Sequence, residues 1–291
     1  DVYKRQIKAH VKRLKPDFVI CGGDLVNNPS LARFRLIERH FSDIGVPFYT
    51  VAGNHDVKNA DRDELFYKIF GPSRRTFNMG GVNFILGLSP LPELPDDEIP
   101  WLTSALDNAA ADGGPIIAVG HVPPFDPFNK GENRFYPAES KKIIELLKNH
   151  STACALYGHV HNYFETGEYG FPLIISGGAG ARLRGPDPFF HYLIFQIKNG
   201  GVSHNIVKLP YKQRGLIHLE YWRNFEETMF YFMDDHPVAF AFTGVFILSW
   251  LMFWPALLFP RIRVKFAGRR LIRTAALLAV TSLSLTGLFT C

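Results

Sequence analysis

Four short loops of this sequence carry side chains that could bind metal ions. They are GGD at residues 22–24, GNHD at 53–56, GHVP at 120–123 and GHVH at 158–161. Each loop has a glycine just before its polar residue, which lets the backbone turn sharply. Together the loops supply two carboxylates, one carboxamide and four imidazoles. Imidazole and carboxylate groups are ligands for divalent first-row metals, so the pattern predicts a metal site.

Each of these loops follows an apolar, strand-like run. Loops at the carboxyl ends of the strands of an α/β sheet cluster in space, and ligands bind there. A carboxylate can bridge two metal ions roughly 3.5–4 Å apart, and such a pair activates water and neutralises phosphoryl oxygens. The loops therefore favour hydrolysis of phosphate esters at a dinuclear metal centre, with a metal-bound hydroxide as the nucleophile.

Apolar periodicity predicts the elements that position the loops. The alternation of strands and helices indicates an α/β domain whose late strands pair antiparallel. A hairpin is predicted over residues 75–88, with its turn at Gly80 and Gly81. The predicted strands occupy 18–21, 46–52, 115–120, 153–157, 171–176, 189–198 and 201–208, and the predicted helices occupy 7–15, 31–43, 63–71, 97–114 and 138–150.

The four loops, in this order, resemble the motifs of the calcineurin-like metallophosphoesterase family. The family pattern is D-x-H, then G-D-x-x, G-N-H-[DE], G-H-x-P and G-H-x-H, and the resemblance covers about residues 7–208. It implies a sandwich of two facing mixed β-sheets flanked by helices.

The resemblance also implies a metal ligand at five positions. Asp24 would bridge two divalent ions, for which Mn, Fe and Zn are candidates. Asn54, His121 and His159 would hold the second ion, and His161 would hold the first. A hydrogen-bonded core histidine is the alternative for His121, whereas His159 and His161 together are hard to explain by packing.

Two further residues of the GNHD loop receive catalytic roles from the resemblance. His55 would lie beside the phosphate and donate a proton to the leaving group or a hydrogen bond to a phosphoryl oxygen. Asp56 would orient His55 and stabilise its charge. The alternative for both residues is a helix-capping pair.

The first family motif, D-x-H, has no match in residues 1–23. The one D-x-H in the chain, Asp234-Asp235-His236, follows no buried strand, and we interpret it as a coincidence. Residues 1–6, DVYKRQ, can be encoded by GAT GTG TAT AAG AGA CAG, which resembles a transposase end sequence used in sequencing libraries. We therefore interpret residues 1–6 as a translated adapter, and expect the native fragment to begin near Ile7, after the first strand and its motif.

Charge and cysteine content argue against two other classes of protein. Six of the 32 Lys and Arg residues follow His236, so residues 1–235 hold 26 basic and 27 acidic residues, a net charge of −1. That balance does not favour a nucleic-acid partner. Cys21, Cys154 and Cys291 form no CxxC motif, so a thiolate zinc site is not expected.

The C-terminal part of the chain is expected to lie in a membrane. Residues 238–259 contain 22 residues without a charge, enough for a transmembrane helix, with a buried soluble helix as the alternative. A second, truncated span is expected over 274–291. The loop 260–273 between them carries six basic and no acidic residues and is expected to be cytoplasmic. The domain at 7–209 and its neck at 210–237 are therefore expected to be extracytoplasmic: periplasmic, extracellular or lumenal.

The sequence thus predicts a membrane-anchored, metal-dependent phosphoesterase acting on a small phosphate mono- or diester. Nucleotides, lipid headgroups, sugar phosphates and phosphoproteins all remain open as substrates. The alternative is a catalytically impaired domain of this fold that acts as a binding or membrane-complex subunit. The lipid bilayer is the expected partner of the C-terminal helices, and no protein partner can be inferred.

Overall fold

The computed structural model describes residues 2–57, 63–89, 91, 94–128, 139–198 and 201–210. These residues belong to one compact unit that spans residues 1–211, which ends close to the predicted domain boundary at residue 209. The predicted neck after Pro210, both predicted membrane spans and the basic loop lie outside the described residues. Within the described residues, no helix is both long enough and apolar enough to cross a membrane.

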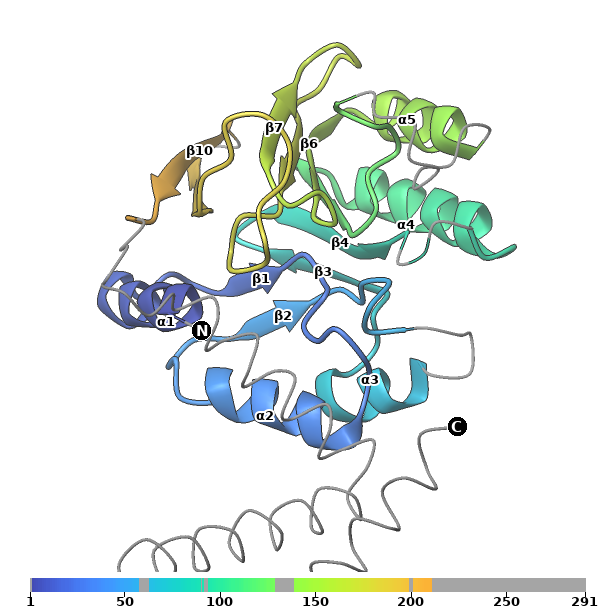
Figure 1. The fold of residues 1–291 in the computed structure, drawn as a ribbon. Coiled ribbons are helices and arrows are strands. Elements are labelled where there is room, and N and C mark those ends of the chain that lie inside the picture. Colours follow the sequence, from blue (N-terminus) through green and yellow to red (C-terminus); the bar gives the residue numbers. More distant parts are fainter. Residues whose placement is uncertain are drawn as a thin grey trace, which may run out of the picture. The chain divides into compact units, whose positions relative to one another are not determined.

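A six-stranded mixed sheet forms the centre of the unit (Figure 1). Four of its strands run parallel, and an antiparallel strand lies at each edge. In sheet order the strands are β3 (Arg75–Met79), β4 (Val82–Leu88), β5 (Ile116–Gly120), β6 (Thr152–Tyr157), β8 (Leu173–Ser176) and β7 (Tyr163–Thr166). The predicted hairpin is confirmed as β3 and β4, whereas β7 was not predicted.

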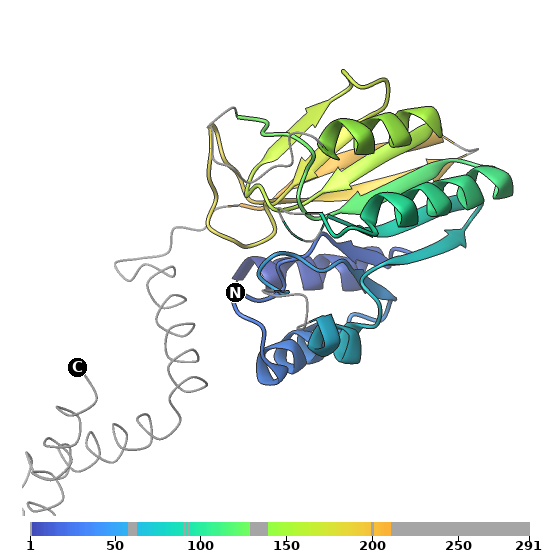
Figure 2. The ribbon, with the colours of Figure 1, turned by 90° about the vertical axis from the view of Figure 1, so that its right-hand side faces the viewer.

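The central strands of this sheet are buried on both faces, as their continuous apolar sequences indicate. On β4, Ile85 and Leu88 face one core, while Phe84 and Leu86 face the other. Helices α4 (Glu98–Asp112) and α5 (Glu139–Asn149) cover the first face (Figure 2). Fully buried side chains such as Leu106 of α4 fill the contact between these helices and the sheet.

Two short sheets cover the other face. One pairs β1 (Val19–Cys21) with β2 (Phe48–Thr50) in parallel, and the other pairs β9 (His191–Lys198) with β10 (Gly201–Lys208) antiparallel. The predicted α/β fold with a mixed sheet and helices is confirmed. A second continuous sheet was expected on this face. The described residues form two separate pairs there instead: β1 and β2, with three residues each, pair with each other, and β9 pairs with β10.

Helices α2 (Leu31–Phe41) and α3 (Asp63–Phe70) pack on the outer side of β1 and β2 (Figure 1). Helix α1 (Val2–Leu14) includes most of residues 1–6, the segment interpreted as a translated adapter. Its Tyr3 ring stacks on Phe190 with ring centroids 3.7 Å apart. The adapter origin of residues 1–6 is not tested by this geometry and stays a prediction.

Candidate metal centre

The four predicted loops meet at the ends of β1, β2, β5 and β6, because their glycines allow the backbones to touch. A Cβ atom on Gly23 would lie 2.7 Å from Nδ1 of His121 and 2.9 Å from the Gly53 nitrogen. One on Gly158 would lie 2.7 Å from the Gly22 carbonyl oxygen. The Gly158 N–H also donates to the His121 carbonyl oxygen at 3.0 Å. Glycine at these positions is therefore required for the loops to converge.

A buried ion-pair network supports the loop that carries His121. Glu98, which is fully buried, accepts from Nη2 of Arg74 at 2.6 Å and from the Ser89 N–H at 2.9 Å. The Ser89 carbonyl oxygen accepts in turn from the Val122 N–H at 3.0 Å. Helix α4 is thus linked through Glu98 to the residue that follows His121.

Three predicted ligands form a group at this junction. Ligand atoms of Asp24, His121 and His159 all lie within 4.8 Å of one another. Asn54 completes the group, because its Oδ1 lies 3.0 Å from Nε2 of His121 and 2.9 Å from Nδ1 of His159. Four of the five predicted ligands are therefore adjacent. The fifth, His161, is not part of this group.

The chemistry of these atoms fits a bound cation. The Nδ1 atom of His121 lies 2.6 Å from the Gly22 carbonyl oxygen and must donate to it, so Nε2 carries the lone pair when the ring is neutral. That lone pair faces two oxygen acceptors, Oδ1 of Asn54 at 3.0 Å and Oδ1 of Asp24 at 3.2 Å. Facing lone pairs repel, so a proton or a metal ion is needed between them.

The electrostatics of the two central ligands agree with this interpretation. Burial by itself would lower the pKa of His121, but the hydrogen bond and charge of Asp24 raise it overall. Burial would likewise raise the pKa of Asp24, but the hydrogen bond and charge of His121 lower it to about 2. The carboxylate of Asp24 is therefore ionised at neutral pH, as a metal ligand must be.

Two ligands of the group also occupy a strained backbone conformation. Asp24 has a φ of 55° and His159 a φ of 60°, in the left-handed region that residues with a side chain rarely adopt. Such conformations persist where the surrounding structure enforces them, and they are common at functional sites. The strain is consistent with side chains that must point to a shared centre.

His55 and Asp56 have partners that differ from those expected. Nδ1 of His55 lies 3.0 Å from the carbonyl oxygen of Asn27, and its backbone N–H donates to Oδ1 of Asp24. Asp56 is fully buried and accepts from the backbone N–H groups of Val26 at 3.1 Å and Gly53 at 3.0 Å. In the described residues the His55 ring is bonded to Asn27, and Asp56 joins two loops. The role expected for Asp56 toward His55 stays a prediction.

Burial raises the pKa of Asp56 to about 6, against the opposing effect of the backbone N–H groups that it accepts from. A carboxyl group with no exposed surface that accepts two main-chain hydrogen bonds is a structural tie between the GGD and GNHD loops. The catalytic role expected for His55 also stays a prediction.

His161 is attached to a later segment of the chain. Its Nδ1 lies 2.8 Å from the Arg182 carbonyl oxygen, and its own carbonyl oxygen accepts from the Arg184 N–H at 3.0 Å. Burial is the largest cause that lowers the pKa of His161, and the positive charge of Arg184 adds to it. A neutral ring that donates through Nδ1 presents its lone pair on Nε2, which suits a metal ligand.

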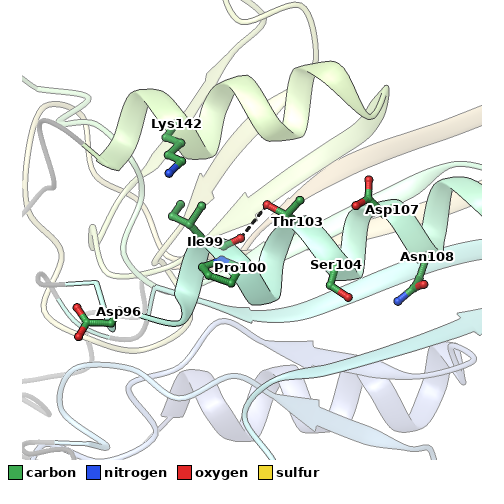
Figure 3. A pocket seen from close by; sticks show the side chains of 8 residues that line it. All are labelled: Asp96, Ile99, Pro100, Thr103, Ser104, Asp107, Asn108 and Lys142. Carbon is green, nitrogen blue, oxygen red and sulfur yellow. Dashed lines mark hydrogen bonds between the residues drawn. The ribbon is translucent and has the colours of Figure 1, made fainter.

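A separate hollow of about 780 Å³ lies along α4 and does not belong to this site (Figure 3). None of the predicted ligands lines it. The side-chain hydrogen bond drawn between its lining residues joins Oγ1 of Thr103 to the Ile99 carbonyl oxygen within the helix, at 2.8 Å. It is lined by Asp96, Ile99, Pro100, Thr103, Ser104, Asp107, Asn108 and Lys142.

Comparison with known proteins agrees with the fold. A family described as "Calcineurin-like phosphoesterase" matches residues 2–163. The serine/threonine-protein phosphatase CPPED1 of Danio rerio is 26% identical over an alignment of 192 residues, which covers 58% of this chain and 62% of that protein. A probable cyclic nucleotide phosphodiesterase of Synechococcus is 24% identical over an alignment of 169 residues, which covers 55% of this chain and 63% of that protein. The chain thus spans less than two thirds of the length of these relatives.

Two solved structures share the fold. A structure titled "GAP50 the anchor in the inner membrane complex of Plasmodium" superposes with a TM-score of 0.56 at 16% identity, covering 74% of this chain and 81% of that one. A dimetal phosphatase from Danio rerio superposes with a TM-score of 0.50 at 15% identity, covering 62% and 78%. At these identities the likeness concerns the fold alone.

Proposed function

Because the chain belongs to the calcineurin-like phosphoesterase family, we propose that it hydrolyses a phosphate ester with the help of divalent metal ions. The observation that carries the proposal is the convergence of Asp24, Asn54, His121 and His159 from four distant loops on one centre. Because relatives are named as a phosphatase and as phosphodiesterases, the proposal includes both phosphate monoesters and phosphate diesters as substrates.

These four residues would hold one metal ion, and Asp24 with His161 would contribute to a second. When bound, the ions supply a water of lowered pKa and positive charge for the phosphoryl oxygens. Asp24 is already ionised, and the Gly22 carbonyl oxygen fixes Nδ1 of His121 as a donor, so the His121 ring is already oriented with Nε2 toward the ion, which would displace any proton there. This preorganisation favours metal binding.

We assign the proton transfer to His55. Its Nδ1 is held by the Asn27 carbonyl oxygen, which leaves Nε2 as the atom that can give a proton to the departing alcohol oxygen. The ring lies one residue after Asn54, and its backbone N–H donates to the Asp24 carboxylate. The main chain of His55 is therefore tied directly to the proposed bridging ligand.

A second candidate function is a binding domain of this fold without catalysis. It is supported by the finding that the described residues contain a single group of His, Cys, Asp or Glu side chains that could hold a metal ion, not two. The two candidates differ in a measurable way, because only the first requires turnover of a phosphate ester.

The test compares the full chain with an Asp24→Asn variant. The proteins are supplied with Mn²⁺ or Zn²⁺ and assayed with 4-nitrophenyl phosphate and bis(4-nitrophenyl) phosphate, and their metal content is measured by mass spectrometry. Loss of a direct ligand should lower kcat by at least the roughly 10–100-fold that loss of an outer-shell partner costs, and it should lower the metal content. Asp112→Asn, an exposed carboxylate at the end of α4, is the matched control. Unchanged turnover in the Asp24 variant would falsify the proposal.

A further inference from the structure

The segment 177–187 lies directly against the fourth loop of the site and is called the arginine segment here. It begins where the Gly177 N–H donates to the Asn162 carbonyl oxygen at 3.0 Å. Its middle bonds to His161 twice, through the Arg182 carbonyl oxygen at 2.8 Å and the Arg184 N–H at 3.0 Å. The main chain of both arginines is therefore next to a predicted metal ligand.

A buried asparagine fixes the shape of the arginine segment. The side chain of Asn162, a residue with 2% exposure, uses its Nδ2 atom to donate to the carbonyl oxygens of Arg184 and Pro186, both at 2.9 Å. Its Oδ1 accepts from the Tyr163 N–H at 2.8 Å. At Gly185, with a φ of 85°, a Cβ atom would lie 2.8 Å from Nδ2 of Asn162. The segment is thus held in one conformation against the site.

The two arginine side chains of this fixed segment have no partner of their own in the described part of the chain. Arg182 and Arg184 are both exposed, and neither guanidinium forms a hydrogen bond or ion pair with a described residue. The one acidic residue of the segment, Asp187, is exposed and forms no ion pair with either of them. By contrast, Arg74 is bonded to both Asp97 and Glu98.

We propose that Arg182 and Arg184 bind a second phosphoryl group of the substrate, so that the preferred substrates are phosphate esters that carry a further phosphate. This inference rests on the proposed phosphoesterase function. A phosphoryl group carries up to two negative charges, which two guanidinium groups balance, and the planar fork of arginine matches phosphate oxygens. Since Asn162 already orders the backbone, binding costs the side-chain entropy of the two arginines but little further backbone entropy.

The test uses two esters that differ only in the second phosphate, adenosine 3′,5′-bisphosphate and adenosine 5′-monophosphate. The full chain, supplied with Mn²⁺, is compared with an Arg182→Gln/Arg184→Gln double variant. The KM for the bisphosphate should rise by about tenfold or more, as expected for losing hydrogen bonds to a charged group. The KM for the monophosphate should change by less than about twofold, and kcat should be unchanged for both. The double variant Arg182→Lys/Arg184→Lys should recover part of the KM.

Arg35→Gln/Arg39→Gln removes the same charge from the exposed face of α2 and serves as the matched control. An equal rise of KM for both esters, or an equal effect of the control, would overturn the inference. Isothermal titration calorimetry of both nucleotides separates this result from failure of the proposed function. If neither ester is hydrolysed, the arginine site is still supported when the parent protein binds the bisphosphate more tightly than the monophosphate and the Arg182→Gln/Arg184→Gln variant does not. Equal binding of both nucleotides by the parent protein refutes it.

Discussion

His121 is held between a backbone carbonyl group and the ligands of the proposed site. The Gly22 carbonyl oxygen fixes one ring nitrogen at 2.6 Å, and oxygen atoms of Asn54 and Asp24 face the other. Its burial, at 1% exposure, makes facing lone pairs unfavourable unless a proton or a metal ion lies between them. A metal ligand and a protonated, hydrogen-bonded core histidine both meet this requirement, so measured metal content decides between them.

The same reasoning predicts the effect of changing Asp56. Both carboxylate oxygens of Asp56 accept a backbone N–H. In Asp56→Asn one of these oxygens is replaced by an NH2 group, which cannot accept and would face the N–H donor. We expect a loss of about 1–3 kcal/mol in the free energy of unfolding. Urea denaturation of the full chain measures it, with Asp112→Asn as the control. If stability were unchanged and only kcat fell, Asp56 would instead act on His55.

Among the elements, the sheets bring the loops together and the helices hold them in place. The four loops lie at strand ends in two different sheets, so their positions depend on how β1 and β2 pack on the central sheet. Helix α4 supports the His121 loop through Glu98, Ser89 and Val122. Helix α1 also forms ion pairs with the turn after α2, because Lys8 and Lys12 both pair with Asp43.

The attachment of α1 predicts a pH-dependent stability. Hydrogen bonds from Lys12 and Lys8 lower the pKa of Asp43 from 3.8 to about 2. A carboxyl group whose pKa is lower in the folded protein than in the unfolded chain stabilises the folded state at pH values above its ordinary pKa. That contribution is lost as the pH falls through the pKa of the folded state. Asp43→Asn should therefore lower the unfolding temperature slightly at pH 6, and the difference should shrink between pH 4 and pH 2.

Thermal unfolding at several pH values and at low and high salt measures this effect. Asp43 is exposed, so salt should also reduce the difference. Asp112→Asn again serves as the control. A difference between parent and variant that stayed constant from pH 6 to pH 2 would show that the ion pairs do not attach α1.

At the scale of the whole molecule, we propose that the unit of residues 1–211 is anchored to a membrane by the apolar stretches that follow it. The proposal rests on 22 uncharged residues at 238–259 and on the six basic residues between this stretch and the next. It places the candidate metal centre outside the cytosol. Substrates would then be extracytoplasmic phosphate esters.

Cysteine labelling tests this topology. In a chain with Cys21→Ser and Cys291→Ser, a cysteine at Ala267 in the basic loop should react with a membrane-impermeant maleimide only after the membrane is opened. A cysteine at the exposed Lys141 of α5 should react from outside in intact cells or spheroplasts. The buried Cys154 should stay unlabelled in both. Labelling of Ala267→Cys from outside would reverse the proposed orientation.

The sequence alone determined the family, the order of most elements and the residues that meet at the site. Ligand chemistry is a property of side-chain type, so Asp24, Asn54, His121 and His159 could be identified from the motifs, and family membership is confirmed. Strand β7 was missed because its four residues, YFET, directly follow the loop of His159 and have no clear apolar pattern.

Only the tertiary structure decided which atoms orient these side chains. The groups that fix His121, His55 and His161 are backbone carbonyl oxygens of Gly22, Asn27 and Arg182. Every residue has such an oxygen, so no sequence pattern distinguishes the ones that matter. Neither the partners of Asp56 nor the position of the arginine segment could be predicted from the sequence. Both depend on contacts between distant parts of the chain, which exist only once it has folded.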